Sequence, residues 1–547
     1  MNLKRFFIAK ISRTIINEWA ELRGHVPRIE LNYPPEERFG DYSTNIAMQL
    51  APLLHRSPMD IAQTLVASLG GMAPVETVEI VPPGFINFKL KHGWLKRQVA
   101  AVLNEKTAFA RSDMGAGKKI VIEFVSANPT GPVTIANGRA AFAGDTLANV
   151  LALGGFRPRR EYYINDIGNQ VNILAESVVR RYWIQQGIKM EYPEYCYQGT
   201  YISDLARRIN VPNYKLNNVQ KIEEVRDKIK GRILEKMIRD IQKLLVNRLG
   251  IKYDEWFSEK TLYSSGTVDT VLALLKKQGV LYKSEGAIWL RTTVYGDDKD
   301  RVLIKANEEP VYFLSDIALR YNRFFKRKFD REIFLLGADH HGYIGRMQAA
   351  MQLLGLADRL DIIIIQMVRL LKKGQEVRMS KRSGTFVTLD ELVEEVGVDA
   401  ARFFFLMHEF NSHMDFDMDL AKKQSKDNPV YYVQYAHARI CSILKKVQGF
   451  APKAEARNVR MELPEVRLIK TILKWPELVT DVSQTYHVHR LPFYAIELAT
   501  QFHDFYTQCR VIQGRSAQRS RVQLIRATQI ILRQVLGTMG ITAPEKM

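Results

Sequence analysis

The chain has 547 residues, long enough for about three domains with substantial hydrophobic cores. Hydrophobic residues make up 46% and charged residues 25%, which is ordinary for a globular protein and excludes a disordered or fibrous chain. The 79 Lys and Arg residues outnumber the 59 Asp and Glu residues, so the net charge is +20. Such a charge suits a polyanionic partner, because neutralised phosphates release counterions, but a solubilising surface explains it equally well.

Cysteine usage and hydropathy indicate a cytoplasmic protein. The three cysteines are too few and too widely spaced for a disulfide framework or a zinc motif, and they are Cys196, Cys441 and Cys509. The longest apolar run, near 362–365, is far shorter than the roughly 20 residues that cross a membrane. The N-terminus is basic, but Lys10 and Arg13 interrupt its apolar residues, so it predicts an amphipathic helix and no signal peptide.

Residues 1–110 form the first predicted unit. Helical periodicity runs over 7–22 and 45–69. A strand segment broken by Pro and Gly follows at 76–90, and its alternation predicts a half-exposed sheet edge. The Gly-rich polar stretch 110–119 then indicates a linker.

Residues 111–420 form the second predicted unit. A buried strand, a helix of small residues and a second strand follow one another over 118–132, 137–155 and 158–166. This order is the start of a parallel βαβ unit. Further strand–helix alternation appears between 331 and 371, and a long charged helical stretch near 180–255 looks like an insertion.

Residues 421–547 form the third predicted unit, with a helical pattern throughout. Its 20 Lys and Arg residues exceed its 9 Asp and Glu residues by 11. Over half of the net charge therefore lies in less than a quarter of the chain. No internal repeat or low-complexity tract is evident in the sequence.

Two segments carry candidate phosphate chemistry. In the first, Pro129 and Pro132 stiffen a loop after a strand, and a helix begins near Asn137. A helix N-terminus in that position favours an anion, although an ordinary tight βα connection has the same pattern. The second segment, 372–392, is a polar loop dense in cations around Lys381. Such a loop suits a transferring phosphate, and the alternative is a solvated basic loop.

These segments together resemble arginyl-tRNA synthetases of the bacterial type, which are class I synthetases with a Rossmann-type catalytic domain. The catalytic unit contains EFVSANPTGP, YYINDIGNQ, GADHHGY and RMSKRSGTFVTLDELVEEVGVDAARFFFL. The first unit contains RFGDYSTNIAMQLA and PPGFINFKL, and the tail contains DNPVYYVQYAHARI and ELATQFHDFYTQCRVI. The resemblance implies an α/β fold in which the Rossmann-type domain is flanked by an α/β N-terminal tRNA-binding domain and an all-α C-terminal anticodon-binding domain.

The implied reaction converts L-arginine and ATP with Mg²⁺ into arginyl-adenylate, and then transfers arginine to the 3′ end of tRNA-Arg. The resemblance implies no tightly bound metal, and we expect a monomer. Tyr312 and Asp316 match the family's guanidinium-binding pair and share one helical face, although a helix offers this spacing by chance as well. The other implied arginine-binding residues are Glu123, Ser126, Asn128, Asn165, Asp166 and Gln170. Asn and Asp at a strand end are also common turn formers.

The first signature motif departs from the family. Where class I enzymes have His-x-Gly-His, this chain has Thr134-Ile135-Ala136-Asn137, so both histidines are missing. Loss of one transition-state donor costs about 2.7–4 kcal/mol in other enzymes. The second signature is better kept, with Arg378-Met379-Ser380-Lys381. The residues expected to act in catalysis are Thr134, Asn137, Ser380 and Lys381, and those expected at ATP are Thr134, Ala136, Asn137, Gly138, His340, His341, Arg378, Met379 and Lys381.

Two readings follow from this departure. In the first, the chain is an active arginine–tRNA ligase that binds phosphate through Thr134, Asn137, backbone amides and Lys381. In the second, it is a paralogue with reduced or lost charging activity that acts as a tRNA-binding protein. Retention of the amino-acid pocket and of the second signature favours the first. A basic RNA-binding protein unrelated to synthetases would fit the charge but would leave the motifs unexplained.

Two surfaces are expected to contact tRNA. Phe85 and Asn87 match positions that in this family read a base of the tRNA D-loop, through stacking and an amide hydrogen bond, and Phe88 should face the core by alternation. In the tail, aromatic and cationic residues alternate along one helical segment, at Tyr431, Tyr435, His437 and Arg439. The two tyrosines, four residues apart, could equally pack against neighbouring helices.

Overall fold

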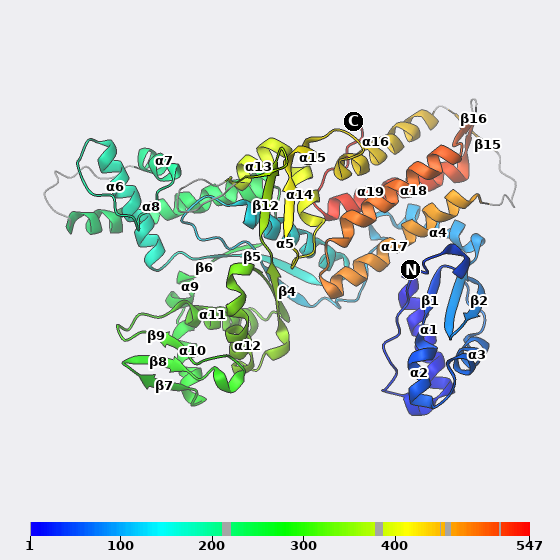
Figure 1. The fold of residues 1–547 in the computed structure, drawn as a ribbon, viewed down its shortest axis with the longest axis horizontal. Coiled ribbons are helices and arrows are strands. Elements are labelled where there is room, and N and C mark those ends of the chain that lie inside the picture. Colours follow the sequence, from blue (N-terminus) through cyan, green and yellow to red (C-terminus); the bar gives the residue numbers. More distant parts are fainter. Residues whose placement is uncertain (1, 210–219, 378–386, 449, 454–460, 514–515) are drawn as a thin grey trace.

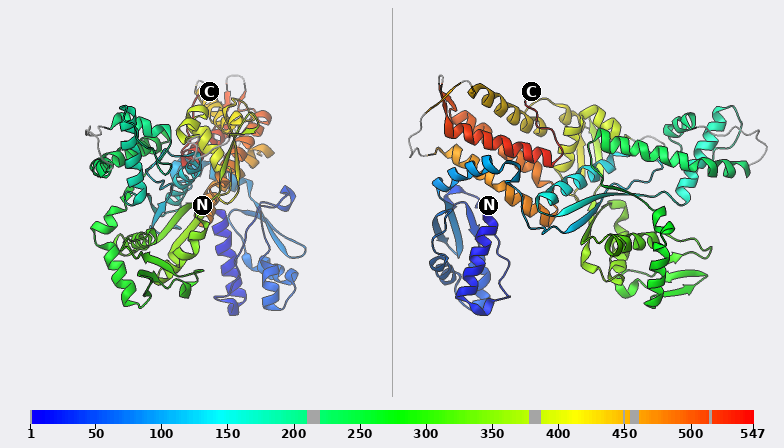
Figure 2. Two further views of the ribbon diagram at one scale, coloured as in Figure 1. Left: turned by 60° about the vertical axis from the view of Figure 1, so that its left-hand side comes forward. Right: turned by 180° about the vertical axis from the view of Figure 1, so that it is seen from behind.

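A computed structural model describes residues 2–209, 220–377, 387–448, 450–453, 461–513 and 516–547. The chain forms an N-terminal unit, a central unit around a parallel sheet, and a helical C-terminal unit (Figure 1). The N-terminal unit lies against the C-terminal helices, whereas a helical insertion projects from the opposite end of the molecule in both front and back views (Figures 1 and 2).

The N-terminal unit packs three helices on a small antiparallel sheet of order β1-β3-β2. Its elements are α1 (Leu3–Glu18), β1 (Tyr42–Thr44), α2 (Ile46–Leu54), α3 (Pro58–Leu69), β2 (Val75–Val81) and β3 (Phe85–Leu90). The periodic apolar side chains of α1 are buried, and the rings of Phe7 and Phe88 stack with centroids 4.8 Å apart. Phe88 faces the core, as the alternation predicts.

A five-stranded parallel sheet of order β11-β10-β4-β5-β6 organises the central unit. Its strands are β4 (Lys119–Glu123), β5 (Arg157–Ile164), β6 (Glu255–Ser258), β10 (Arg331–Gly337) and β11 (Leu360–Ile365). The buried crossover helix α5 (Ile135–Leu153) joins β4 to β5. The chain runs outward from β4 to β6 and then crosses to β10, so the order reverses beside β4. Open parallel sheets bind ligands at the carboxyl ends of strands next to such a reversal.

Two insertions extend this sheet. The predicted charged insertion is α6 (Asn169–Gln185), α7 (Thr200–Arg208) and α8 (Gln220–Gln242), which share a separate hydrophobic core. The second insertion follows β6, and the sequence patterns did not indicate it. Its elements are α9 (Lys260–Ser264), α10 (Thr267–Lys277), β7 (Leu281–Ser284), β8 (Ala287–Leu290), β9 (Arg301–Ile304) and α11 (Tyr312–Tyr321), whereas α12 (Ile344–Leu353) lies in the predicted crossover between β10 and β11. This second insertion carries the predicted Tyr312 and Asp316 on α11.

The remainder of the central unit leads into the helical tail. It comprises β12 (Val368–Lys372), β13 (Gln375–Glu376), α13 (Leu389–Val396), α14 (Val398–Leu406), β14 (Met414–Asp417) and α15 (Met418–Lys422). Short 3-10 and π-helical segments join the main elements, at Ala20–Leu22, Glu37–Phe39, Lys106–Ala108, Lys243–Arg248, Thr293–Tyr295, Asn322–Lys326, Ala338–Tyr343 and Ala357–Arg359. β12 pairs with β13 and β14 in a separate three-stranded sheet.

The tail is helical, as predicted. Its main helices are α16 (Pro429–Val447), α17 (Leu463–Thr485), α18 (Arg490–Gln508) and α19 (Arg519–Thr538). A small sheet formed by β15 (Ala451–Lys453), β16 (Ile512–Gln513) and β17 (Ser516–Gln518) adds to them. Helix α4 (His92–Glu105), which the sequence assigns to the first unit, packs on α17 and α19. Within the described ranges, no helix has the length and apolar character needed to cross a membrane.

Candidate active site

The predicted polar residues after β4 and β5 meet at one edge of the sheet. The Asn165 side-chain amide donates to Asn128 Oδ1 at 2.7 Å, and the Tyr163 backbone N–H donates to Ser126 Oγ at 3.0 Å. Val125 and Ser126 both adopt left-handed backbone conformations, with φ of 70° and 37°. A β-branched residue rarely takes this conformation, and such strain concentrates at functional turns. The fold therefore brings Ser126, Asn128 and Asn165 together beside the sheet reversal.

The Thr134–Asn137 turn forms the N-terminal cap of α5. The backbone N–H and the hydroxyl of Thr134 donate to Asn137 Oδ1 at 3.2 and 3.0 Å. The Thr134 hydroxyl proton is therefore used inside the turn, whereas the Asn137 amide NH₂ is the side-chain donor left for a ligand. Ala136 is exposed on the same turn. Gly138 is buried, and a Cβ at this position would lie 2.6 Å from Leu389 Cδ1, so the glycine lets α5 approach α13.

Tyr312 and Asp316 lie on successive turns of α11. The Tyr312 ring is 54% exposed and its hydroxyl lies near Gly168, at the start of α6. The Asp316 side chain is 21% exposed, and Arg320 Nη1 donates to it at 3.3 Å. Burial raises the pKa of Asp316 to about 7, and the neighbouring charges of Glu123 and Glu259 act in the same direction. A cationic ligand at this position would relieve the cost of the buried carboxylate.

Glu259 is a further carboxyl group close enough to Asp316 to raise its pKa, and sequence reasoning missed it. It follows β6 directly and is 1% exposed, and its Oε2 has no hydrogen-bond partner. Burial raises its pKa to about 7, with the negative charge of Asp166 contributing. A carboxylate directly after a parallel strand could have indicated Glu259 in the sequence. However, β6 is hard to predict because it has four residues and follows an insertion. Together, Glu259 and Asp316 offer paired acceptors for a cationic group.

Glu123 is placed differently from the prediction that it faces the α-amino group. It is 3% exposed, and Arg323 Nη2 donates to it at 2.6 Å. The same guanidinium also binds Glu161 and Glu332, both fully buried. Glu123 therefore belongs to an ionic network beneath the site, where its charge is already compensated. The sequence analysis did not foresee this network, because Arg323 lies 200 residues away in the chain.

The other predicted residues fall into three groups. Asp166 accepts from the Ser258 hydroxyl and from the Lys260 N–H, which is the turn-forming role of the alternative interpretation. Gln170 is exposed on the first turn of α6. His340 and His341 lie in the 3-10 segment after β10, with side chains outside the described structure. The second signature also lies outside the described residues, at Arg378, Met379, Ser380 and Lys381.

The two surfaces predicted to contact tRNA are partly exposed. Phe85 is 38% exposed at the start of β3, whereas Asn87 is 5% exposed and its Oδ1 has no hydrogen-bond partner. On α16, the rings of Tyr431 and Tyr435 stack with centroids 6.5 Å apart. The Arg439 guanidinium completes this stripe.

Helix α18 adds two aromatic residues to the α16 stripe. Arg439 lies 4.9 Å from the ring centroid of Tyr506, and the His503 ring stacks 6.0 Å from that of Tyr435. His437, by contrast, is fully buried, and its Nδ1 lies 2.8 Å from the Pro544 carbonyl oxygen. It lies off the stripe because two residues along a helix turn a side chain by about 200°. The aromatic–arginine patch is therefore Tyr431, Tyr435, Arg439, His503 and Tyr506.

Comparisons with known proteins agree with this architecture along the whole chain. The family models for the arginyl tRNA synthetase N terminal domain, the tRNA synthetases class I (R) catalytic domain and the DALR anticodon binding domain match residues 5–90, 98–425 and 433–547. An arginine–tRNA ligase of Geobacter sp. (strain M21) is 44% identical over 537 residues, covering 96% of each chain. One of Carboxydothermus hydrogenoformans is also 44% identical, over 95% of this chain and 94% of its own.

The solved structure of Thermus thermophilus arginyl-tRNA synthetase shares the fold, with a TM-score of 0.78 and 22% identity over all of both chains. The parallel sheet with its strand-end site, flanked by these two accessory units, defines a class I aminoacyl-tRNA synthetase. Within that class, the chain belongs to the arginyl-tRNA synthetase family.

Proposed function

We propose that the protein ligates L-arginine to tRNA-Arg. The observation that carries this proposal is the pair of carboxyl groups of Asp316 and Glu259 on the second insertion, both with raised pKa values, with Tyr312 one helical turn before Asp316. A guanidinium needs planar, charge-assisted acceptors, and these two carboxyl groups need a cation to be ionised together. Arginine satisfies both requirements.

In the first step, the arginine carboxylate attacks the α-phosphorus of ATP, forming arginyl-adenylate and releasing pyrophosphate. Mg²⁺ enters with ATP as part of the substrate. The N-terminus of α5 supplies backbone N–H groups and the positive end of its dipole to the phosphates, and Asn137 supplies an amide donor. Lys381 is proposed to meet the triphosphate from the second signature. Ser126, Asn128 and Asn165 would orient the amino-acid backbone at the strand ends.

In the second step, a hydroxyl of the terminal adenosine of tRNA attacks the activated carbonyl carbon and AMP leaves. We assign tRNA binding to Phe85 and Asn87 in the N-terminal unit and to the aromatic–arginine patch in the C-terminal unit. Aromatic side chains stack on unpaired bases, and arginine contributes both charge and stacking. We further propose a monomeric enzyme that acts in the cytoplasm.

ATP–pyrophosphate exchange with cognate tRNA present tests the function. Arginine should support exchange, and lysine and glutamine at equal concentration should not. The tRNA is included because the family resemblance implies that activation requires it. A protein that binds tRNA but gives no arginine-dependent exchange would contradict ligase activity and support the paralogue that only binds tRNA.

A further inference from the structure

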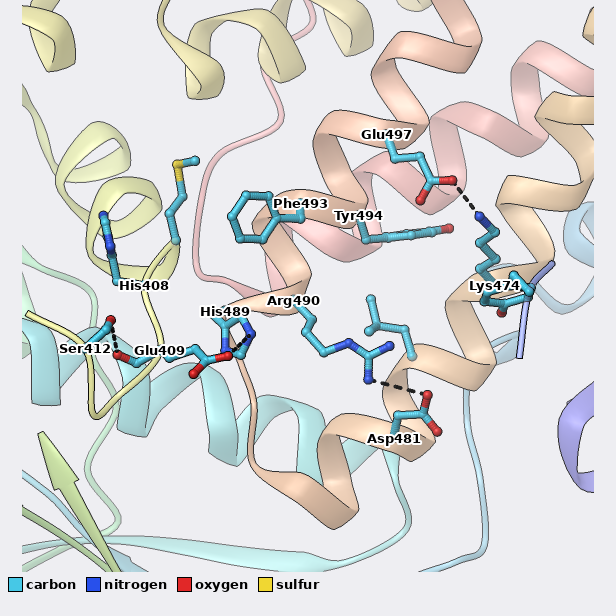
Figure 3. Close-up of a pocket in the computed structure, with 13 residues that line it drawn as sticks. His408, Glu409, Ser412, Lys474, Asp481, His489, Arg490, Phe493, Tyr494 and Glu497 are labelled. Atoms are coloured by element: carbon cyan, nitrogen blue, oxygen red, sulfur yellow. Dashed lines mark hydrogen bonds and ion pairs between the residues drawn. The ribbon is translucent and has the colours of Figure 1, made fainter. Parts of the chain in front are cut away.

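A pocket of about 540 Å³ opens where the three units of the chain meet (Figure 3). Tyr33 lines it from the N-terminal unit, the loop after α14 lines it with His408 and Glu409, and α18 lines it with Arg490 and Phe493. Figure 3 shows the loop residues on one side and the α18 residues on the other. Among the residues that the structure describes, those assigned above to arginine, ATP or tRNA do not line this pocket.

Helix α5 anchors the loop that forms this wall of the pocket. Arg139, on α5 two residues after Asn137, is 1% exposed and donates to the carbonyl oxygens of Gln366, Glu409 and Ser412, at 3.2 Å for Gln366 and 2.8 Å for Ser412. Burial lowers the pKa of its guanidinium to about 10. The buried Arg139 guanidinium thus fixes the loop backbone, so this wall of the pocket has a defined structure.

The charges of the lining disfavour an anion. Lys474 and Arg490, the lysine and arginine among the lining residues, already face Glu497 at 2.6 Å and Asp481 at 3.5 Å. Glu409 adds a carboxylate 3.5 Å from His489, and burial lowers the pKa of that imidazole, so it is uncharged at neutral pH. A phosphate entering this pocket would meet no uncompensated positive charge from the lining.

The same lining suits a flat, uncharged ring with donors and acceptors on its edge. The Phe493 ring is 51% exposed, although phenylalanine is normally buried. His408 faces the pocket with its pKa lowered by burial, so its neutral ring offers one donor and one acceptor. Nucleobases have this chemistry, and unstacked bases bind proteins by stacking on aromatic rings while their edges are hydrogen-bonded.

We propose that this pocket takes one unstacked base of the bound tRNA, stacked on Phe493 and hydrogen-bonded by His408. The inference rests on the proposed function and adds a contact beyond those at Phe85 and at the aromatic–arginine patch. RNA is the source of the base because the pocket joins the two units assigned to tRNA binding, and because a free nucleotide would bring its phosphates into a lining without free positive charge.

Replacement of Phe493 tests the proposal by the affinity for tRNA-Arg, measured by filter binding at fixed salt. Phe493→Ala should weaken binding about 5- to 100-fold, the range for loss of one stacked base. Phe493→Trp keeps a stacking surface and should stay within about threefold of the unmodified protein. Val294→Ala, at an apolar residue that is 72% exposed in the second insertion, is the matched control and should bind normally.

A second measurement identifies the occupant. Chemical probing of the complex should show one tRNA base that is protected by the unmodified protein and by Phe493→Trp and becomes reactive with Phe493→Ala. Unchanged affinity and unchanged protection in Phe493→Ala would overturn the proposal. Binding of free AMP that depends on Phe493, with tRNA binding unaffected, would overturn it in favour of a small-nucleotide site. Normal arginine-dependent exchange by the unmodified protein separates these failures from failure of the proposed function.

Discussion

At the residue scale, two carboxyl groups with raised pKa values form the proposed site for the arginine guanidinium: Glu259 is 1% exposed and the Asp316 side chain is 21% exposed. Asp316 accepts from Arg320, which is itself buried and lies 2.9 Å from Glu332, and the charge of Glu259 helps to raise the pKa of Asp316. A buried carboxylate is costly without a cation. A bound guanidinium would therefore offset the cost of ionising Asp316 and Glu259 together.

Asp316→Asn should raise the KM for arginine at least 100-fold, because the charge-assisted acceptor of the guanidinium is lost. The KM for ATP should change less than threefold, since the phosphates bind at α5. Exchange kinetics with each substrate varied in turn provide the measurement. Equal changes for both substrates would contradict the assignment of Asp316 to arginine.

The same Asp316→Asn variant should be more stable than the unmodified protein at high pH. The pKa of Asp316 rises from 3.8 to about 7 on folding, so the folded state retains a proton that the unfolded state releases. Ionising Asp316 in the folded state lowers the free energy of unfolding. This destabilisation is absent below about pH 4, grows between pH 4 and 7, and is fully present at pH 8, where it is about 2–4 kcal/mol. Thermal melts without arginine should show a higher Tm for the variant at pH 8 and similar values at pH 4.5. A lower Tm for Asp316→Asn than for the unmodified protein at pH 8 would contradict a destabilising effect of the ionised Asp316.

Glu259→Gln should weaken arginine binding 10-fold or more at pH 8, because the second acceptor loses its charge. In the unmodified protein, the KM for arginine should rise as pH falls from 8 to 6, since protonated carboxyl groups do not pair with a guanidinium. Glu308→Gln makes the same change at an exposed glutamate just before α11 and serves as the control. A control that weakens arginine as much as Glu259→Gln would indicate a general charge effect.

At the element scale, the N-terminus of α5 combines two tasks. It would offer its dipole and backbone donors to phosphate in the proposed reaction, and its Thr134–Asn137 cap fixes the direction of the helix that also bears Arg139. An N-cap contributes about 0.5–2 kcal/mol to stability. The side chains of Thr134 and Asn137 therefore stabilise the start of the helix by bonding to each other, whether or not a ligand is bound.

The combined variant Thr134→His, Ala136→Gly and Asn137→His restores the histidine-containing pattern of the class. We expect pyrophosphate exchange to stay unchanged or to rise, because histidine can supply a charged donor to phosphate. Thermal melts should accompany the kinetics, since loss of the cap lowers stability. Complete loss of exchange in a folded variant would show that the turn depends on the Thr134–Asn137 pair.

At the scale of the whole molecule, one buried carboxyl group ties the N-terminal unit to the helical tail. Glu477, on α17, is 1% exposed and accepts from the hydroxyls of Tyr33 and Tyr42 and from the Lys4 N–H at 3.1 Å. Peripheral ion pairs join the same two units, between Asp41 and Lys470 and between Glu37 and Arg467. The relative placement of the two tRNA-binding units thus depends on this contact.

Glu477→Ala should loosen the N-terminal unit, because it leaves the buried Tyr42 hydroxyl and the partly buried Tyr33 hydroxyl without their acceptor, at about 1–3 kcal/mol for the buried one. The affinity for tRNA should fall, while the KM for arginine at saturating tRNA should stay unchanged. Limited proteolysis should cut faster within 106–118, where Ser112 and Asp113 pair with Arg5 of the N-terminal unit. Glu21→Ala removes an exposed glutamate of the same unit as the control. Normal tRNA affinity and proteolysis in Glu477→Ala would show that the contact is dispensable.

Much of this architecture follows from local sequence. The strands around β4, the crossover helix α5 and the helical tail were predicted because apolar periodicity and turn residues act over short distances. The motif order also predicted the family. The sequence patterns placed Tyr312 and Asp316 on one helix and the start of another helix near Asn137. The second insertion was not predicted, since its strands have four residues each and their pattern is weak.

The sequence by itself determined the family, most elements of the parallel sheet and the helical tail, and the helical spacing of Tyr312 and Asp316. Only the tertiary structure showed which polar side chains pair with one another. It turned Glu123 toward Arg323 and His437 toward Pro544, and it brought Glu259 beside Asp316. The physical reason is that burial, charge pairing and pKa shifts arise between residues distant in the chain, whereas a sequence pattern reports only the neighbours along it.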